Sequence, residues 1–157
     1  MKLLPKYVIS VDPGLSTGLA LIASEGPELC DSREVEVLKV EDALLEMLTK
    51  VPAEDAADEQ HALLFVVEKF TINAKTVRNS QAPWSLEVIG IARNTLWRER
   101  GLTPVMQQPS DAMDLMVNRR LRAVNCWYVG GAGHANDAIR HGLFALHQRG
   151  WRDKRLL

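Results

Sequence analysis

The chain has 157 residues, of which 46% are hydrophobic and 25% charged, so it can form one domain, spanning residues 1–157, with a sizeable core. No apolar run approaches the length of a membrane span, and Pro5 and Lys6 interrupt the N-terminal residues too early for a secretory leader. These features predict a soluble cytoplasmic protein. Two cysteines, Cys30 and Cys126, exclude a disulfide framework and favour free thiols, although a single disulfide between them remains open.

The net charge of −1 hides an asymmetry along the chain. Residues 1–68 carry 5 Lys and Arg against 14 Asp and Glu, net −9, whereas residues 69–157 carry 14 against 6, net +8. This division is typical of a carboxylate-rich site combined with a polyanion-binding surface. Two ordinary solvated surfaces would have the same composition.

Residues 7–22 consist of two apolar stretches separated by a short turn that begins with Asp12, Pro13 and Gly14. This pattern predicts two antiparallel strands joined by a tight turn. Asp12 then lies at the end of a central strand, where a carboxylate is costly unless a cation pairs with it. The alternative is an ordinary Asp that begins the turn.

The elements expected next are a strand at 32–37, a helix at 41–48, an acidic loop at 51–61 and a buried strand at 62–67. The last of these strands ends at Glu68. If it lies beside the first strand, Asp12 and Glu68 come together and repel each other unless a cation lies between them. Glu68 could instead be a surface charge that merely ends the strand.

A long amphipathic helix is expected at residues 82–98, with its tryptophans at the core or the core edge, and a fifth strand at 102–107. A further helix follows Pro109. Ser110 is its expected N-cap, with Asp111 and Asp114 in the first turn, where the helix dipole favours anions. The same helix is expected to carry three arginines that could meet phosphates or only water: Arg119, Arg120 and Arg122.

Residues 130–133 are Gly-rich and open a last helix at 134–149, but Asn136 occupies the third glycine position of a dinucleotide-binding motif. We therefore expect no nucleotide cofactor. His134 and Asp137, three residues apart, share one face of the first turn and could bind one ion. The alternative is a helix-capping histidine followed by an N-terminal acid. His141, one turn further, could support a ligand or simply be partly buried.

Three motifs occur in order: I9-S-V-D-P-G-L-S-T-G, V66-V-E-K-F and H134-A-N-D-A-I-R-H-G. Together they resemble the RuvC-type Holliday-junction resolvases of the ribonuclease H-like superfamily, over residues 7–146. The resemblance implies an α/β fold with a five-stranded mixed sheet and helices on both faces. The chain departs from the family ahead of the last helix, where Q107-Q-P-S-D-A-M-D lacks clearly matched basic residues.

The resemblance also implies an activity: metal-dependent cleavage of branched DNA, most of all four-way junctions, by phosphodiester hydrolysis. It implies that two Mg²⁺ or Mn²⁺ ions per active site are held by Asp12, Glu68, His134 and Asp137. Phe70 corresponds to an aromatic residue that wedges into the junction. The DNA contacts expected on charge alone are Lys75, Arg78, Arg119, Arg120 and Arg122. A homodimer is implied, with the helix at 82–98 as its natural interface.

Three alternatives remain open. The chain could bind branched nucleic acid without cutting it, or it could cut RNA–DNA hybrids. A sugar-kinase or actin-type phosphate binder also begins with a strand and a loop of Asp, Gly and Thr, but that fold needs a second domain, for which 157 residues leave no room. A compact resolvase would suit either a bacterium or a bacteriophage. The sequence indicates neither the cleavage-site preference nor the range of branched substrates.

Overall fold

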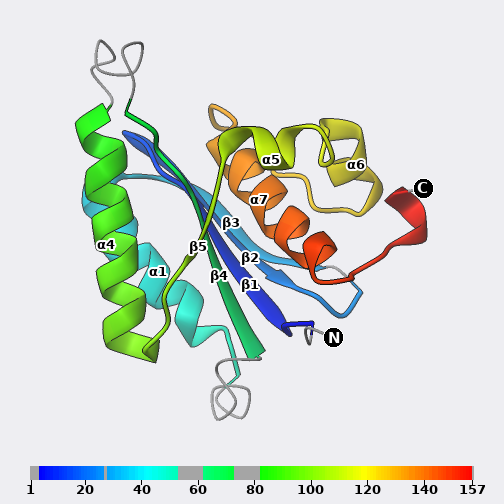
Figure 1. The fold of residues 1–157 in the computed structure, drawn as a ribbon, viewed down its shortest axis with the longest axis horizontal. Helices are drawn as coiled ribbons and strands as arrows, with labels where there is room; N and C mark the ends of the chain where they lie inside the picture. The colour runs from blue at the N-terminus through cyan, green and yellow to red at the C-terminus, as the bar shows by residue number, and fades with distance from the viewer. Residues whose placement is uncertain (1–3, 27, 53–61, 73–81, 157) are drawn as a thin grey trace.

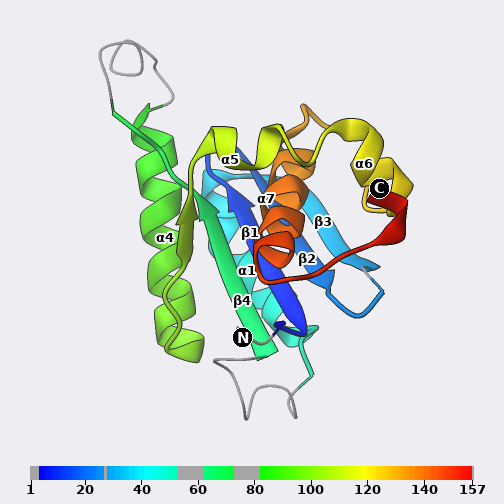
Figure 2. The same ribbon diagram turned by 45° about the vertical axis from the view of Figure 1, so that its right-hand side comes forward.

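The structure is a computed structural model, and it describes residues 4–26, 28–52, 62–72 and 82–156. Its centre is a five-stranded sheet in the order β3-β2-β1-β4-β5 (Figures 1 and 2). The strands are β1 (Tyr7–Asp12), β2 (Ser16–Ala23), β3 (Glu28–Glu36), β4 (Leu63–Glu68) and β5 (Val105–Gln107). The first three strands pair antiparallel, whereas β4 pairs parallel with both β1 and β5, so the sheet is mixed.

Helices cover both faces of this sheet (Figures 1 and 2). One face carries α1 and α4, and the other carries α7, with α5 and α6 beside it. The helices are α1 (Val40–Thr49), α4 (Ala82–Arg100), α5 (Pro109–Met113), α6 (Asn118–Ala123) and α7 (His134–Gln148). Short 3₁₀ turns, η1 (Val37–Lys39) and η2 (Lys154–Leu156), precede α1 and follow α7. Among the described residues, no helix combines the length and apolarity needed to cross a membrane.

The central strands are apolar on both sides because each face is covered, as expected for strands in a layered α/β fold. Alternate residues of β1 divide between two cores. Ile9 and Val11 join the core beneath α1 and α4, whereas Val8 joins the core beneath α7. The short turn from β1 to β2 is closed by Thr17, whose hydroxyl donates to the Gly14 carbonyl at 2.8 Å.

Helix α7 lies directly against β1 and β2 because small side chains allow the close approach. A Cβ added at Gly18 would lie 1.9 Å from the His134 carbonyl oxygen. Further along, the Ser10 hydroxyl donates a hydrogen bond of 2.7 Å to the Ala138 carbonyl, and a Cβ at Gly142 would lie 2.9 Å from the same hydroxyl oxygen. These contacts fix the first turn of α7 above the carboxyl end of β1.

The structure confirms most of the expected elements and corrects three details. Ser110 is not the N-cap of α5: Gln108 is, with Pro109 at the first helical position, where a missing N–H costs nothing, and Asp111 accepts from the Gln108 N–H at 2.9 Å. The helix ends at Met113, and Val117, the N-cap of the next helix, adopts an extended backbone conformation. Consequently Arg119, Arg120 and Arg122 belong to the separate helix α6.

The third correction concerns the tryptophans of α4. Trp84 is 40% exposed and Trp97 63% exposed, so neither is a core residue. The buried stripe of α4 is formed by Val88, Ala92 and Leu96, and Trp97 follows the last of these on an adjacent, outward-facing position.

The expected acidic loop at 51–61 lies largely outside the described residues. Cys30 is exposed and Cys126 buried, and no disulfide joins them.

Candidate metal centre

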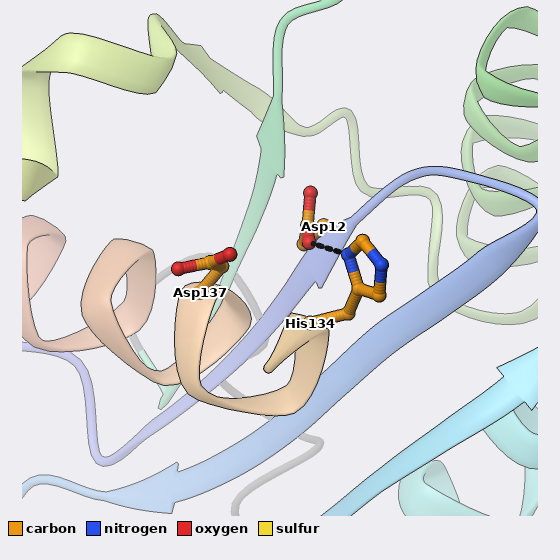
Figure 3. A group of neighbouring side chains, drawn as sticks. All are labelled: Asp12, His134 and Asp137. Carbon is orange, nitrogen blue, oxygen red and sulfur yellow. Dashed lines mark hydrogen bonds and ion pairs between the residues drawn. The ribbon is translucent and has the colours of Figure 1, made fainter. Parts of the chain in front are cut away.

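Three predicted side chains meet at the carboxyl end of β1 (Figure 3). Asp12 is the last residue of β1, and His134 and Asp137 project toward it from the first turn of α7. One possible ligand atom from each lies within 4.8 Å of the other two. His134 Nδ1 lies 2.8 Å from Asp12 Oδ2. The structure therefore brings together two carboxylates and an imidazole from distant parts of the chain.

Another carboxylate, that of Glu34 on β3, fixes the start of α7. It accepts hydrogen bonds from the backbone N–H groups of Ala132 at 2.7 Å, Gly133 at 2.8 Å and Ala135 at 3.1 Å. Desolvation, the largest single effect, would raise the pKa of Glu34, but these N–H donors outweigh it and hold the pKa below its ordinary value. Gly131 has φ +65 and leaves no room for a Cβ beside the Glu34 carboxylate. Gly131 and Gly133 thus allow the backbone to fold around the Glu34 carboxylate, which caps the start of α7.

The electrostatics of the site are those of an incompletely neutralised acidic cluster. Burial raises the pKa of Asp12 to about 6, an effect that the hydrogen bond from His134 partly offsets and the charge of Glu68 reinforces. Burial also raises the pKa of Asp137. The pKa of His134 is raised chiefly by its hydrogen bond to Asp12. A bound cation would supply the missing positive charge for both carboxylates.

Glu68 lies next to this group but is not one of the three that converge. Val11 and Val67 are paired across β1 and β4, so Asp12 and Glu68 follow on adjacent strand ends, as the sequence predicted. The Glu68 carboxylate, however, lies 2.7 Å from His141 Nε2. The charge of Glu68 nevertheless adds to the rise in the pKa of both Asp12 and Asp137, which burial chiefly causes.

His141 is the centre of a buried polar chain that reaches Glu68. It is 2% exposed, and its Nδ1 lies 2.7 Å from the side-chain oxygen of Gln107 on β5. Glu68 and Gln107 are themselves register partners in the parallel pairing of β4 and β5. The sequence left open whether His141 supports a ligand or is simply buried. It is buried, and it also contacts the candidate ligand Glu68.

Arg140 plays a corresponding part for Asp137, and sequence reasoning missed it. Its guanidinium donates to the carboxylate of Asp137 and to the side-chain oxygen of Asn118, and its Nε donates to the Met116 carbonyl at 3.1 Å. Arg140 is only 9% exposed. An arginine three residues after an aspartate on a helix was the available signal. The contacts to Asn118 and Met116 depend on the tertiary fold.

The predicted DNA contacts differ in their surroundings. Arg119 is exposed on α6. Arg120 donates to the Leu115 carbonyl at 2.5 Å, and the Arg122 guanidinium lies 4.4 Å from the centre of the Trp127 ring. Arg119 and Arg122 are thus both exposed, whereas Arg120 is partly buried.

Phe70 lies beside the candidate site. With Glu68, Pro109 and Ser110 it lines a hollow of about 390 Å³ between the end of β4 and the start of α5. Lys75 and Arg78 lie outside the described residues.

Comparisons with known proteins bear on the fold. No protein-family model matches the sequence, and no curated protein is significantly similar to it. A solved structure, T. thermophilus RuvC in complex with Holliday junction substrate, is similar with a TM-score of 0.68, covering 91% of this chain and 94% of that chain at 16% sequence identity. The fold is ribonuclease H-like, as in RuvC. The expected fold class is confirmed, while the chemistry must be argued from the site itself.

Proposed function

We propose that the protein is a metal-dependent endodeoxyribonuclease that cuts branched DNA, with four-way junctions as its main substrate. The observation that carries this proposal is the convergence of Asp12, His134 and Asp137 at the carboxyl end of a central strand in a ribonuclease H-like fold. The similar RuvC structure was solved with a Holliday junction, which supports the choice of substrate.

The residues of the site fit a divalent metal ion. Two carboxylates and one imidazole offer ligand atoms within 4.8 Å of one another, and the raised pKa of Asp12 reflects a buried charge without full compensation. Asp12, His134 and Asp137 would hold the metal, with Glu68 as the nearest further ligand. Oxygen ligands suit Mg²⁺ and Mn²⁺, and the imidazole favours Mn²⁺ somewhat. A pair of such ions supplies activation of water and stabilisation of the leaving oxygen.

The remaining residues of the site position these ligands. Arg140 holds the carboxylate of Asp137, His141 holds that of Glu68, and Glu34 anchors the turn that carries His134. Asp12 is 7% exposed, so its orientation is set by the protein rather than by solvent. Preorganised ligands of this kind lower the cost of ordering the site when substrate binds.

The basic second half of the chain would contact the DNA backbone without reading sequence. Arg119 and Arg122 are the exposed arginines of α6. Phe70, in the hollow beside Glu68, lies where it could insert between bases at a branch point. A homodimer would present two sites to two strands, and α4 offers exposed apolar side chains, Leu86 at 45% and Trp97 at 63%, for that contact.

The test is cleavage of a labelled synthetic four-way junction beside a linear duplex and an RNA–DNA hybrid, with Mg²⁺, Mn²⁺ or chelator. We expect paired nicks in the junction alone, lost with chelator and in Asp12→Asn. Asp114→Asn is the matched control, because Asp114 is an exposed carboxylate outside the site. Preferential cutting of the hybrid would favour the ribonuclease alternative. Junction binding without cutting under any condition would overturn the proposal and favour a binding module.

A further inference from the structure

A pocket of about 430 Å³ lies at the far end of α7 from the candidate metal centre. It is enclosed by the last turn of α7, the segment between α5 and α6, and the residues just before and within η2. Leu115 and Met116 supply its apolar part, and Arg120, His147 and Arg152 supply polar groups, together with Lys154. Its volume and its combination of apolar surface with a few polar groups are those of a small-molecule site.

Positive charge in this pocket is not compensated by the carboxylate that lines it. Asp153 is paired instead with Arg155, with 2.6 Å between Asp153 Oδ2 and the guanidinium. Arg120 donates to a backbone carbonyl, and Arg152 donates to the carbonyls of His147 and Trp151, both at 2.8 Å. Among the described residues, no carboxylate pairs with Arg120, Arg152 or Lys154 at salt-bridge distance. Burial, reinforced by the charges of Arg152 and Arg120, lowers the pKa of His147 and disfavours the charged imidazole.

We propose that this pocket binds an unpaired nucleotide of the DNA substrate. The inference rests on the proposed function, since each nucleotide of the DNA substrate combines a phosphate with a flat base. The guanidinium groups of Arg120 and Arg152, with Lys154, bind the phosphate, for which arginine has the matching donor geometry. Leu115 faces the base, whose π surface stacks on apolar side chains whatever the sequence.

The position of the pocket determines where on the DNA this nucleotide lies. His134 and His147 are thirteen residues apart on α7, which corresponds to about 20 Å along the helix axis. A DNA strand that follows α7 covers this distance in about six nucleotides at roughly 3.4 Å each. The pocket therefore receives a single-stranded branch or a frayed arm about six nucleotides from the cleaved phosphate. Substrates with such a branch bind more tightly than fully paired junctions.

The experiment is a titration of the full chain in chelator, where no DNA is cut, followed by NMR of the labelled leucine and methionine methyl groups. The probes are deoxyadenosine monophosphate, deoxyadenosine, inorganic phosphate and a six-residue oligothymidylate. We expect the mononucleotide and the oligonucleotide to shift the Leu115 signals, and deoxyadenosine and phosphate each to bind about tenfold more weakly than the mononucleotide. Tighter binding of the oligonucleotide than of the mononucleotide indicates DNA as the source of the ligand. The reverse order indicates a free nucleotide and overturns the proposal.

The variants distinguish binding in this pocket from a general effect of positive charge on the protein surface. Arg152→Gln combined with Lys154→Gln weakens mononucleotide binding by about tenfold, and Arg152→Lys in place of Arg152→Gln restores part of it. Lys39→Gln, which removes an exposed charge next to α1 on the opposite face of the sheet, leaves binding unchanged. The proposal is overturned if the double variant binds the mononucleotide as tightly as the wild type does. It is also overturned if phosphate binds as tightly as the mononucleotide, or if the Leu115 signals do not shift. Nucleotide binding by a protein that cuts no junction would refute the nuclease function and leave the pocket standing.

Discussion

Replacing Asp12 by asparagine should stabilise the metal-free protein. The pKa of Asp12 is raised by burial from its ordinary value of 3.8 to about 6, so the folded protein holds this proton more tightly than the unfolded chain does. Stability is therefore lost as pH rises from about 4 to about 6, and the loss persists at higher pH. The difference corresponds to about 3 kcal/mol at pH 8. Asparagine removes the buried charge with little change in shape, so Asp12→Asn should recover up to that amount.

The assay is urea denaturation in chelator at pH 4.5, 6 and 8 for the wild type, Asp12→Asn and the control Asp114→Asn. We expect the advantage of Asp12→Asn to be about 1 kcal/mol at pH 4.5 and largest, about 3 kcal/mol, at pH 8. At pH 6 the stability advantage of Asp12→Asn is smaller than at pH 8. His134, whose pKa is raised, is then partly protonated, and its charge stabilises the wild type by pairing with Asp12. Adding Mn²⁺ should stabilise the wild type and Asp114→Asn but not Asp12→Asn. A variant less stable than the wild type at pH 8, or one with the same pH dependence, would refute this reasoning.

Three further predictions concern the residues around the site. Arg140→Met should cost roughly 3 kcal/mol in urea denaturation, since it leaves the partly buried carboxylate of Asp137 without its partner; a change within experimental error would show that the ion pair contributes nothing. His141→Phe should weaken Mn²⁺ binding, measured calorimetrically, by about 10- to 100-fold by releasing Glu68, and His141→Gln should recover part of the loss; equal affinities in all three proteins would exclude a positioning role. Gly18→Ala should destabilise the fold by about 1–3 kcal/mol and lower junction cleavage, because its Cβ would lie 1.9 Å from the His134 carbonyl oxygen; wild-type stability and cleavage would mean that α7 moves away without cost.

The sequence predicted those parts of the site that depend on local pattern. Asp12 could be placed at a strand end because an apolar run stops there, and His134 and Asp137 could be placed on one helix face because they are three residues apart. The five-stranded mixed sheet followed from the family resemblance, whereas the order of its strands comes from the structure. Their meeting at one point required only that the last helix pack over the first strand, which Gly18 permits.

The residues that escaped prediction act across the sheet. Glu34 lies on an edge strand with no local feature to distinguish it from other acids, yet it caps α7 about a hundred positions later in the chain. Arg140 and His141 were within the predicted helix, but their partners come from other elements. No glycine or proline marks the break between α5 and α6 at Val117, so the sequence predicted a single helix there.

The most direct test of the central claim is pulsed EPR spectroscopy of Mn²⁺ bound to the protein in the presence of a four-way junction, with cleavage measured on the same sample. We predict magnetic coupling of the bound Mn²⁺ to an imidazole nitrogen of His134. This coupling should disappear in His134→Asp while metal binding and junction cleavage persist, and both should be lost in Asp137→Asn. Mn²⁺ bound without nitrogen coupling in the wild type, or cleavage undiminished in Asp137→Asn, would place the reacting metal elsewhere and contradict the account.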